Sequence, residues 1–70
     1  MERLRGKIAR VIKAKGFGFV VGDDGQERFL HVTDFLDQND WEEVREGTVL
    51  TFTHLDTPKG GRCGEVSFAD

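Results

Sequence analysis

Lys15-Gly16-Phe17-Gly18-Phe19-Val20 is the stretch that decides the fold, because it sets two aromatic rings on one face of a strand. Side chains two positions apart in a strand point to the same face, so Phe17 and Phe19 stand side by side. The opposite face, lined by glycine and valine, lets a neighbouring backbone come close, which suits a tightly closed barrel. An outward aromatic face beside a lysine suits stacking on unpaired bases. Taken alone, the stretch also allows the alternative that both rings face the core.

The residues that follow predict a β-hairpin. Strands are expected at residues 17–21 and 26–32, because both runs are rich in β-branched and aromatic residues. They are joined by Gly22-Asp23-Asp24-Gly25, in which Gly25 suits the left-handed position of a three-residue loop. The hairpin is therefore expected to be centred on Asp24.

The register of this hairpin favours the outward orientation of the two rings. Around Asp24, the flat side chains fall opposite one another, Phe17 facing His31 and Phe19 facing Phe29. Four rings then form one patch on one face of two paired strands. The opposite face carries the small and aliphatic residues expected in a core, namely Gly18, Val20, Leu30 and Val32.

The remainder of the chain consists of short apolar runs separated by glycine-containing turns. Further strands are expected at residues 5–13, 48–55 and 62–68, the last two joined by Thr57-Pro58-Lys59-Gly60-Gly61. Five short strands around a small core predict an all-β fold, a partly open five-stranded antiparallel β-barrel of the oligonucleotide-binding (OB) type. One domain over residues 1–70 accommodates them.

Residues 33–47 are acidic and irregular and predict a long connecting loop, in which Thr33 caps a single turn. The strand that follows alternates, with Leu50, Phe52 and His54 on one face, and Phe52 is assigned to the core. Two further phenylalanines are assigned to the interior, Phe35 at the open end of the barrel and Phe68 in the core.

Length and composition exclude several classes of function. A chain of 70 residues buries only about 60% of its unfolded surface, which leaves little room for an enclosed active site. No nucleophile–base pair is recognisable, and the two histidines and the single Cys63 lack the spacing of a metal site. Nothing argues for an oxidising compartment, and no apolar run approaches the ~20 residues of a membrane span. We therefore expect a cytoplasmic protein that is not an enzyme and has no cofactor, no metal and no membrane partner.

The net charge of −3 conceals an uneven distribution of charge. Residues 1–15 hold six basic side chains against one acid, Glu2, whereas the rest of the chain holds four basic side chains against twelve acids. This split predicts one basic face and one acidic face. A basic face beside exposed rings is what a nucleic-acid-binding surface requires, and ordinary solvated charge is the alternative.

Together these residues resemble the cold-shock domain family. Lys15-Gly16-Phe17-Gly18-Phe19-Val20 is similar to that family's first ribonucleoprotein motif, K-G-F-G-F-I/V. Arg28-Phe29-Leu30-His31-Val32 resembles the second motif, V-F-V-H-F, and the similarity extends over about residues 6–68. The resemblance implies a five-stranded β-barrel that binds single-stranded RNA or DNA with little sequence preference. It also implies activity as an RNA chaperone or as a regulator of transcription or translation.

By position, the resemblance assigns base stacking to the four rings of the hairpin and a phosphate contact to Lys15. Trp41 lies near a loop aromatic that stacks a further base in some members, and its alternative role is to anchor the acidic loop to the barrel. Arg10 stands where the family has a stacking tryptophan, and Val32 where the second motif ends in phenylalanine. The nucleic-acid-binding residues predicted in this way are Arg10, Lys15, Phe17, Phe19, Phe29, His31 and Trp41.

The absence of aromatic residues at positions 10 and 32 is expected to lower the affinity of this chain for nucleic acid. Because stacking contributes about 1–3 kcal/mol per base, we expect weaker and more salt-sensitive binding than a full aromatic set gives. Arg10 recovers part of the loss, since its planar guanidinium stacks on bases and attracts phosphate.

Two functions are therefore compared. The first is a monomeric, single-stranded nucleic-acid-binding protein of the cold-shock type. The second is a protein-interaction module that keeps the barrel but has lost most of its nucleic-acid affinity. The missing aromatics and the net acidity motivate the second function, because an exposed aromatic patch also seats a partner protein.

Overall fold

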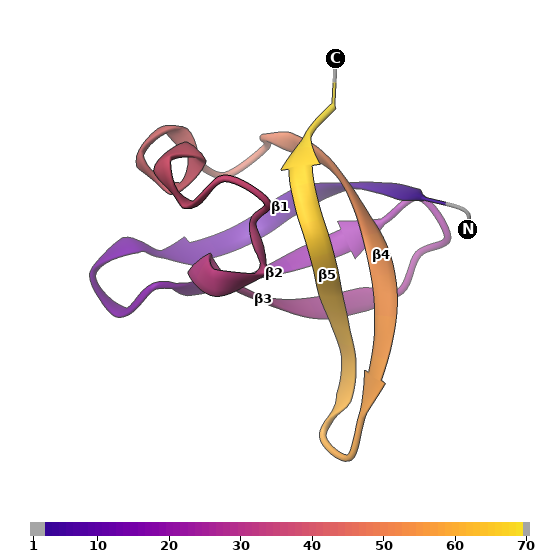
Figure 1. Cartoon of the computed structure of the whole chain (residues 1–70). Helices are drawn as coiled ribbons and strands as arrows, with labels where there is room; N and C mark the ends of the chain where they lie inside the picture. Colours follow the sequence, from indigo (N-terminus) through magenta and orange to yellow (C-terminus); the bar gives the residue numbers. More distant parts are fainter. Residues whose placement is uncertain (1–2, 70) are drawn as a thin grey trace.

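The computed structural model describes residues 3–69, in which five strands close into one barrel (Figure 1). The strands are β1 (Leu4–Ile12), β2 (Phe17–Gly22), β3 (Glu27–His31), β4 (Val49–Thr57) and β5 (Gly60–Phe68). The described residues also form three short 3-10 helices, η1 (Lys13–Lys15), η2 (Val32–Asp34) and η3 (Gln38–Glu43). The all-β barrel is thus confirmed. Residues 1, 2 and 70 of the predicted domain, Glu2 among them, lie outside the described residues.

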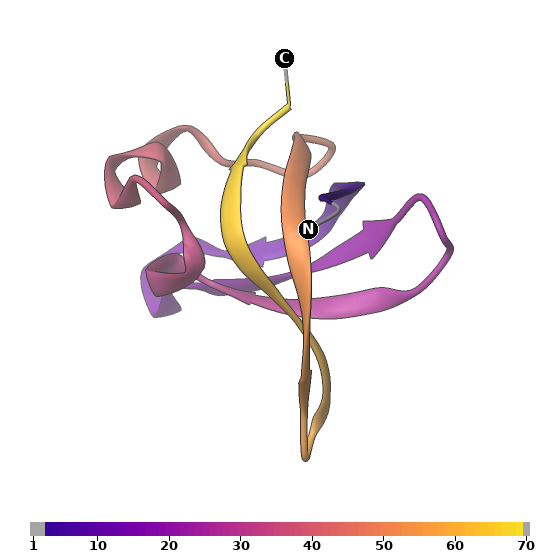
Figure 2. The ribbon, with the colours of Figure 1, turned by 45° about the vertical axis from the view of Figure 1, so that its right-hand side comes forward.

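The barrel closes through a parallel contact between β3 and β5, which was not predicted from the sequence. The order around the barrel is β1-β2-β3-β5-β4, and β4 returns to β1. Four of the pairings are antiparallel, whereas β3 and β5 run parallel and meet at Phe29 and Arg62. The connection between β3 and β4 lies at one side of the barrel, and the β4–β5 hairpin extends beyond the other strands (Figures 1 and 2). Because the connection between β3 and β4 crosses to the other side of β5 in the strand order, β5 runs beside β3 in the same direction.

The β2–β3 hairpin has the predicted register. Gly25 has a φ of 83°, the left-handed conformation that glycine adopts readily, and its N–H donates to the Gly22 carbonyl oxygen over 2.8 Å. On the strand itself, Gly18 packs so closely on β1 that a Cβ there would collide with the Arg10 carbonyl oxygen. The ring residues pair as expected, Phe17 with His31 and Phe19 with Phe29.

The pairing of β4 with β5 is interrupted by a bulge in β5. Between the pairs of Thr51 with Ser67 and Thr53 with Gly64, Phe52 of β4 lies opposite two residues of β5, one of which, Glu65, has a φ of 47°. Phe52 and Thr53 are both buried. His54 is half-buried, and its ring accepts a hydrogen bond from Arg28 on β3. The bulge adds its extra residue to β5, and a period-two sequence pattern does not reveal it.

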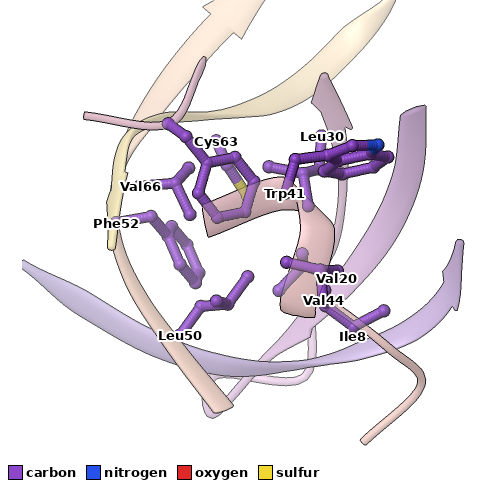
Figure 3. Close-up of a cluster of buried hydrophobic side chains, with 10 residues drawn as sticks. Ile8, Val20, Leu30, Trp41, Val44, Leu50, Phe52, Cys63 and Val66 are labelled. Carbon is purple, nitrogen blue, oxygen red and sulfur yellow. The ribbon is translucent and has the colours of Figure 1, made fainter. Parts of the chain in front are cut away.

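The barrel interior is filled from all five strands and from the connection between β3 and β4 (Figure 3). Phe52 is completely buried and Phe68 packs against the core at half burial, as expected. Phe35 is 4% exposed and bridges to Val66 on β5, so it seals the core on that side. Cys63 fills space in the core, and burial raises the pKa of its thiol to about 12. The buried apolar residues are Ile8, Val20, Leu30, Phe35, Trp41, Val44, Leu50, Phe52, Cys63 and Val66.

Residues 33–47 are more ordered than the predicted long loop. They contain η3, whose Trp41 is 8% exposed and meets Phe35 edge-on, with ring centroids 5.9 Å apart. The preceding η2 is capped by the side chain of His31, not by Thr33, and it ends before Phe35. This segment buries apolar side chains in the core, which gives it a defined conformation. Its acidic composition does not indicate this conformation.

Candidate nucleic-acid interface

Four rings lie together on the outer face of β2 and β3, because alternation turns their chain neighbours into the core. Phe17 and Phe29 are stacked, with centroids 5.8 Å apart and planes inclined by 27°. Phe19 meets both of them edge-on at 6.2 and 6.0 Å, and His31 lies 6.4 Å from Phe29. All four side chains are half-buried. They form a continuous surface, the ring patch, that is supported from below and still reaches solvent.

Strand pairing extends the ring patch into a row with an arginine at each end. Phe19 pairs with Arg10 on β1 and with Phe29 on β3. Phe29 in turn pairs with Arg62 on β5. Residues that pair directly on neighbouring strands present their side chains on the same face. Two planar guanidinium groups therefore flank two phenylalanine rings across four strands.

Arg62 is held in place by Asp34. Its Nε donates to Oδ1 and Oδ2 of the carboxylate over 3.2 and 3.0 Å, and its Nη2 donates to Oδ1 over 2.9 Å. The Asp34 side chain is 10% exposed and that of Arg62 is 35% exposed. These hydrogen bonds raise the pKa of the Arg62 guanidinium. Its central carbon lies 5.7 Å from the centroid of Phe29, so the ion pair fixes a cation against the ring patch.

His31 is fixed through both its backbone and its ring. Its N–H donates to Asp34 Oδ2 over 2.9 Å, and its Nδ1 accepts from the Thr33 N–H over 3.2 Å. Because Nδ1 is an acceptor, the neutral ring carries its proton on Nε2. Asp34 therefore anchors two parts of the same face, the backbone of His31 and the side chain of Arg62.

A groove of about 520 Å³ lies along the row of rings. The end of the β4–β5 hairpin, which projects from the barrel in Figure 2, forms its second wall. Its volume falls within the usual range of ligand pockets, and its lining combines aromatic surface with positive charge. Such a lining suits a planar aromatic group that carries an anion. The lining residues are Phe19, Phe29, Thr57, Pro58, Lys59 and Arg62.

Two of the six basic side chains near the N-terminus are bound by the protein itself. Arg3 Nη2 donates to oxygens of β4 and β5, among them the Glu65 carbonyl oxygen over 2.6 Å. Lys13 Nζ donates to the Trp41 carbonyl oxygen and lies 5.3 Å from the centroid of the Trp41 ring. The other four are exposed and form no ion pair or side-chain hydrogen bond with a described residue; they are Arg5, Lys7, Arg10 and Lys15.

Trp41 is separated from the other predicted site residues. Its ring is buried, and its Nε1–H donates to the Lys13 carbonyl oxygen over 3.5 Å. Base stacking needs an exposed ring face. The burial therefore removes Trp41 from the candidate interface and agrees with the alternative that it anchors the acidic segment. Arg10 lies in the row of the ring patch, and Lys15 lies in η1, just before β2.

The sequence interpretation missed the ion pair on this face and the charged residue behind it. Arg62 and Asp34 are 28 positions apart, so no local spacing connects them. Arg28 is 3% exposed beneath the face, and it donates to Asp24 Oδ2 over 2.7 Å and to His54 Nδ1 over 2.8 Å. The hydrogen bond from Arg28 lowers the pKa of Asp24 to about 2. The one sequence signal for the burial of Arg28 was the alternation of inward and outward side chains along β3.

Residues 3–69 contain no group of three or more His, Cys, Asp or Glu side chains placed to hold a metal ion. None of the helices in the described part of the chain has the length and apolar character needed to cross a membrane.

Comparison with known proteins places this barrel in a family. The sequence model of the 'Cold-shock' DNA-binding domain matches residues 4–68. A cold shock-like protein of Thermotoga maritima is 27% identical over 67 residues, which are 96% of this chain and 100% of that protein. The cold shock-like protein CspC of Bacillus cereus is 27% identical over 63 residues, which are 90% of this chain and 95% of CspC. Because the match runs from the first residue of β1 to the last of β5, the chain belongs to the cold-shock domain family, whose members generally bind single-stranded nucleic acids.

Proposed function

We propose that this chain binds single-stranded RNA or DNA on the ring patch, with successive bases stacked on Phe17, Phe19, Phe29 and His31. The observation that carries the proposal is the ring patch itself, four half-buried rings spaced 5.8–6.4 Å apart on one outer face. Every base has a π-face, so stacking on such rings is tolerant of sequence. A monomer that holds strands unpaired in this way acts as an RNA chaperone or a regulator of transcription or translation in the cytoplasm.

Exposed cations beside the ring patch supply the phosphate contacts. Arg10 stands in the row next to Phe19, and Lys15 precedes β2 in η1. Both are exposed and unpaired among the described residues. Arg10 occupies the position of a stacking tryptophan and offers a planar cation in its place. Electrostatic attraction therefore takes a larger share of the binding free energy than it would with the tryptophan present.

Replacing Phe29 by alanine is expected to weaken binding of a short pyrimidine oligonucleotide about 5- to 150-fold at low salt. Phe29 contacts two other rings of the patch, and one stacked base contributes about 1–3 kcal/mol. Fluorescence titration with labelled dT7 measures the dissociation constant, and thermal unfolding confirms that the variant is folded.

Leu36→Ala is the matched control for Phe29→Ala. Leu36 is 66% exposed, lies between η2 and η3 and does not line the groove beside the rings, so its truncation should leave the affinity unchanged. No binding of dT7 by the unaltered chain at low salt would refute the proposal. So would equal affinities for the unaltered chain and Phe29→Ala. Capture of a partner protein that survives nuclease treatment and depends on Phe17 would instead support a protein-interaction module.

Affinity is expected to fall linearly with salt on a log–log plot. Each phosphate neutralised on a single strand contributes about −0.7 to the slope. Arg10→Gln should make the slope shallower by about 0.7, because it removes one exposed cation beside the rings. Titrations of dT7 over a series of salt concentrations measure this slope. An unchanged slope in Arg10→Gln would show that Arg10 makes no phosphate contact.

A further inference from the structure

The two arginines at the ends of the row differ in their surroundings. Arg10 is exposed and has no carboxylate partner among the described residues. Arg62 is paired with Asp34, whose charge offsets that of the guanidinium. Arg10 therefore attracts phosphate as an unpaired charge. Arg62 is a weaker attractor of phosphate, and its remaining N–H groups act as directed donors.

The ion pair determines which N–H groups of Arg62 stay available. The guanidinium has five N–H donors, and Asp34 takes the edge formed by Nε and Nη2. Among the described residues, Nη1 has no acceptor. The other edge, formed by Nη1 and the second hydrogen of Nη2, thus keeps two parallel N–H groups free. This free edge has the fork geometry that pairs with two adjacent acceptors.

The free edge belongs to a side chain that lines the same groove as the rings. Arg62 shares that groove with Phe19 and Phe29, and its side chain is 35% exposed. A base that enters the groove and stacks on a ring presents its edge to the guanidinium. Asp34 is itself held by the His31 N–H, so the orientation of Arg62 is fixed before any ligand arrives.

We infer that Arg62, positioned by Asp34, makes this face prefer a guanine at the base that stacks on Phe29. This inference rests on the proposed function. Guanine presents two adjacent acceptors, O6 and N7, and the bidentate contact of an arginine with them is the commonest specific contact to a base. Adenine presents an acceptor beside a donor, and thymine presents a single carbonyl on the corresponding edge, so neither satisfies both N–H groups.

The preference is tested with heptamers that differ at one base. The probes are dT7 and its variants with a central dG, dA, dC or 7-deaza-dG, titrated at one salt concentration. A central dG is expected to bind about 5- to 150-fold more tightly than dT7, the discrimination of one good bidentate pair. The 7-deaza base lacks the N7 acceptor and should lose most of this gain. Equal affinity for dG and dT, or tighter binding of dC than of dG, would overturn the inference.

Arg62→Lys separates directed donors from charge, because lysine keeps the charge and has no planar fork. The variant should lose the preference for dG over dT7, measured as the ratio of the two dissociation constants, and should keep the salt slope because the charge is retained. Arg10→Lys is the matched control at the other end of the row and should keep the preference. If Arg62→Lys retains the preference for dG, the guanine contact is wrong.

Asp34→Asn tests the positioning role of the carboxylate. It leaves Arg62 in place but removes the charge that holds it. The preference for dG should fall, while the salt slope should steepen by about 0.7 as the cation becomes available to phosphate. Thermal unfolding shows whether the variant is folded, and Arg62→Lys gives an independent test if it is not. Binding of all heptamers with equal affinity would overturn this inference alone, whereas failure of every heptamer to bind would overturn the proposed function with it.

Discussion

Phe52→Ala is expected to lower the free energy of unfolding by about 3–5 kcal/mol. Phe52 is completely buried in β4, and the guanidinium carbon of Arg28 lies 5.3 Å from its ring centroid. Its removal leaves a cavity in the packed core of the barrel. A domain of 70 residues has a total stability of about 4–10 kcal/mol, so this single change brings the chain close to unfolding at 25 °C.

Urea denaturation followed by the fluorescence of Trp41, the only tryptophan, measures this loss. Trp41 is buried in the same core, so its emission reports loss of the barrel. Leu55→Ala is the control on the same strand, because Leu55 is 45% exposed and its truncation should cost less than about 1 kcal/mol. A loss below about 1 kcal/mol for Phe52→Ala would contradict the central place given to this ring.

The hairpin that carries the rings was predictable because its information is local. Gly25 fixes the turn, alternation fixes which side chains share a face, and one register satisfies both. The same local reasoning could not show that β5 meets β3 in parallel, since that contact forms only when the barrel closes. It also could not show the pair of Arg62 with Asp34, which depends on that closure.

Trp41 and Arg28 show a second limit of prediction from sequence. The composition of a segment gives the wrong burial for a residue that differs from its neighbours in the chain. Trp41 stands among acidic residues that suggest a solvated loop, yet its ring is buried on Phe35. Arg28 falls on the inward side of β3 by the same alternation that places Leu30 there. Its charge argues against burial until its partners, Asp24 and His54, are brought together by the fold.

Arg28→Ala is expected to lower the free energy of unfolding by about 3 kcal/mol, because it removes a buried side chain together with its charged hydrogen bonds. The Arg28 side chain is 2% exposed, and its loss leaves a cavity and removes the donor to His54 Nδ1. Asp24 is 45% exposed and regains water, which keeps the loss from being larger. Arg28→Met fills the space of the stem and should lose less. Urea denaturation compares the two variants, and equal losses would show that the volume of the stem is unimportant.

The pH dependence of stability isolates the charge of Arg28 from its volume. In the folded chain the pKa of Asp24 is lowered from 3.8 to about 2, first through the hydrogen bond from Arg28. A carboxyl group whose pKa is lower in the folded chain stabilises the fold at pH values above its pKa in the unfolded chain. This contribution is lost as pH falls from about 4 towards 2. Arg28→Met removes the hydrogen bond to Asp24. The difference in the free energy of unfolding between the unaltered chain and Arg28→Met should therefore shrink as pH falls over this range. A difference that stays constant from pH 5 to about 2 would show that the pair does not stabilise the barrel.

Oligonucleotide binding by Arg28→Met tests whether Arg28 also affects the ring patch on the outer face of β3. Arg28 and Phe29 are neighbours on β3 with opposite orientations, one inward and one in the ring patch. If Arg28 acts only on stability, Arg28→Met should bind dT7 with unchanged affinity wherever it is fully folded. Because β3 carries both Phe29 and His31, a shift of this strand would instead weaken stacking at two rings together. Weaker binding by a folded Arg28→Met protein would therefore show that the buried arginine sets the position of the ring patch as well as the stability of the barrel.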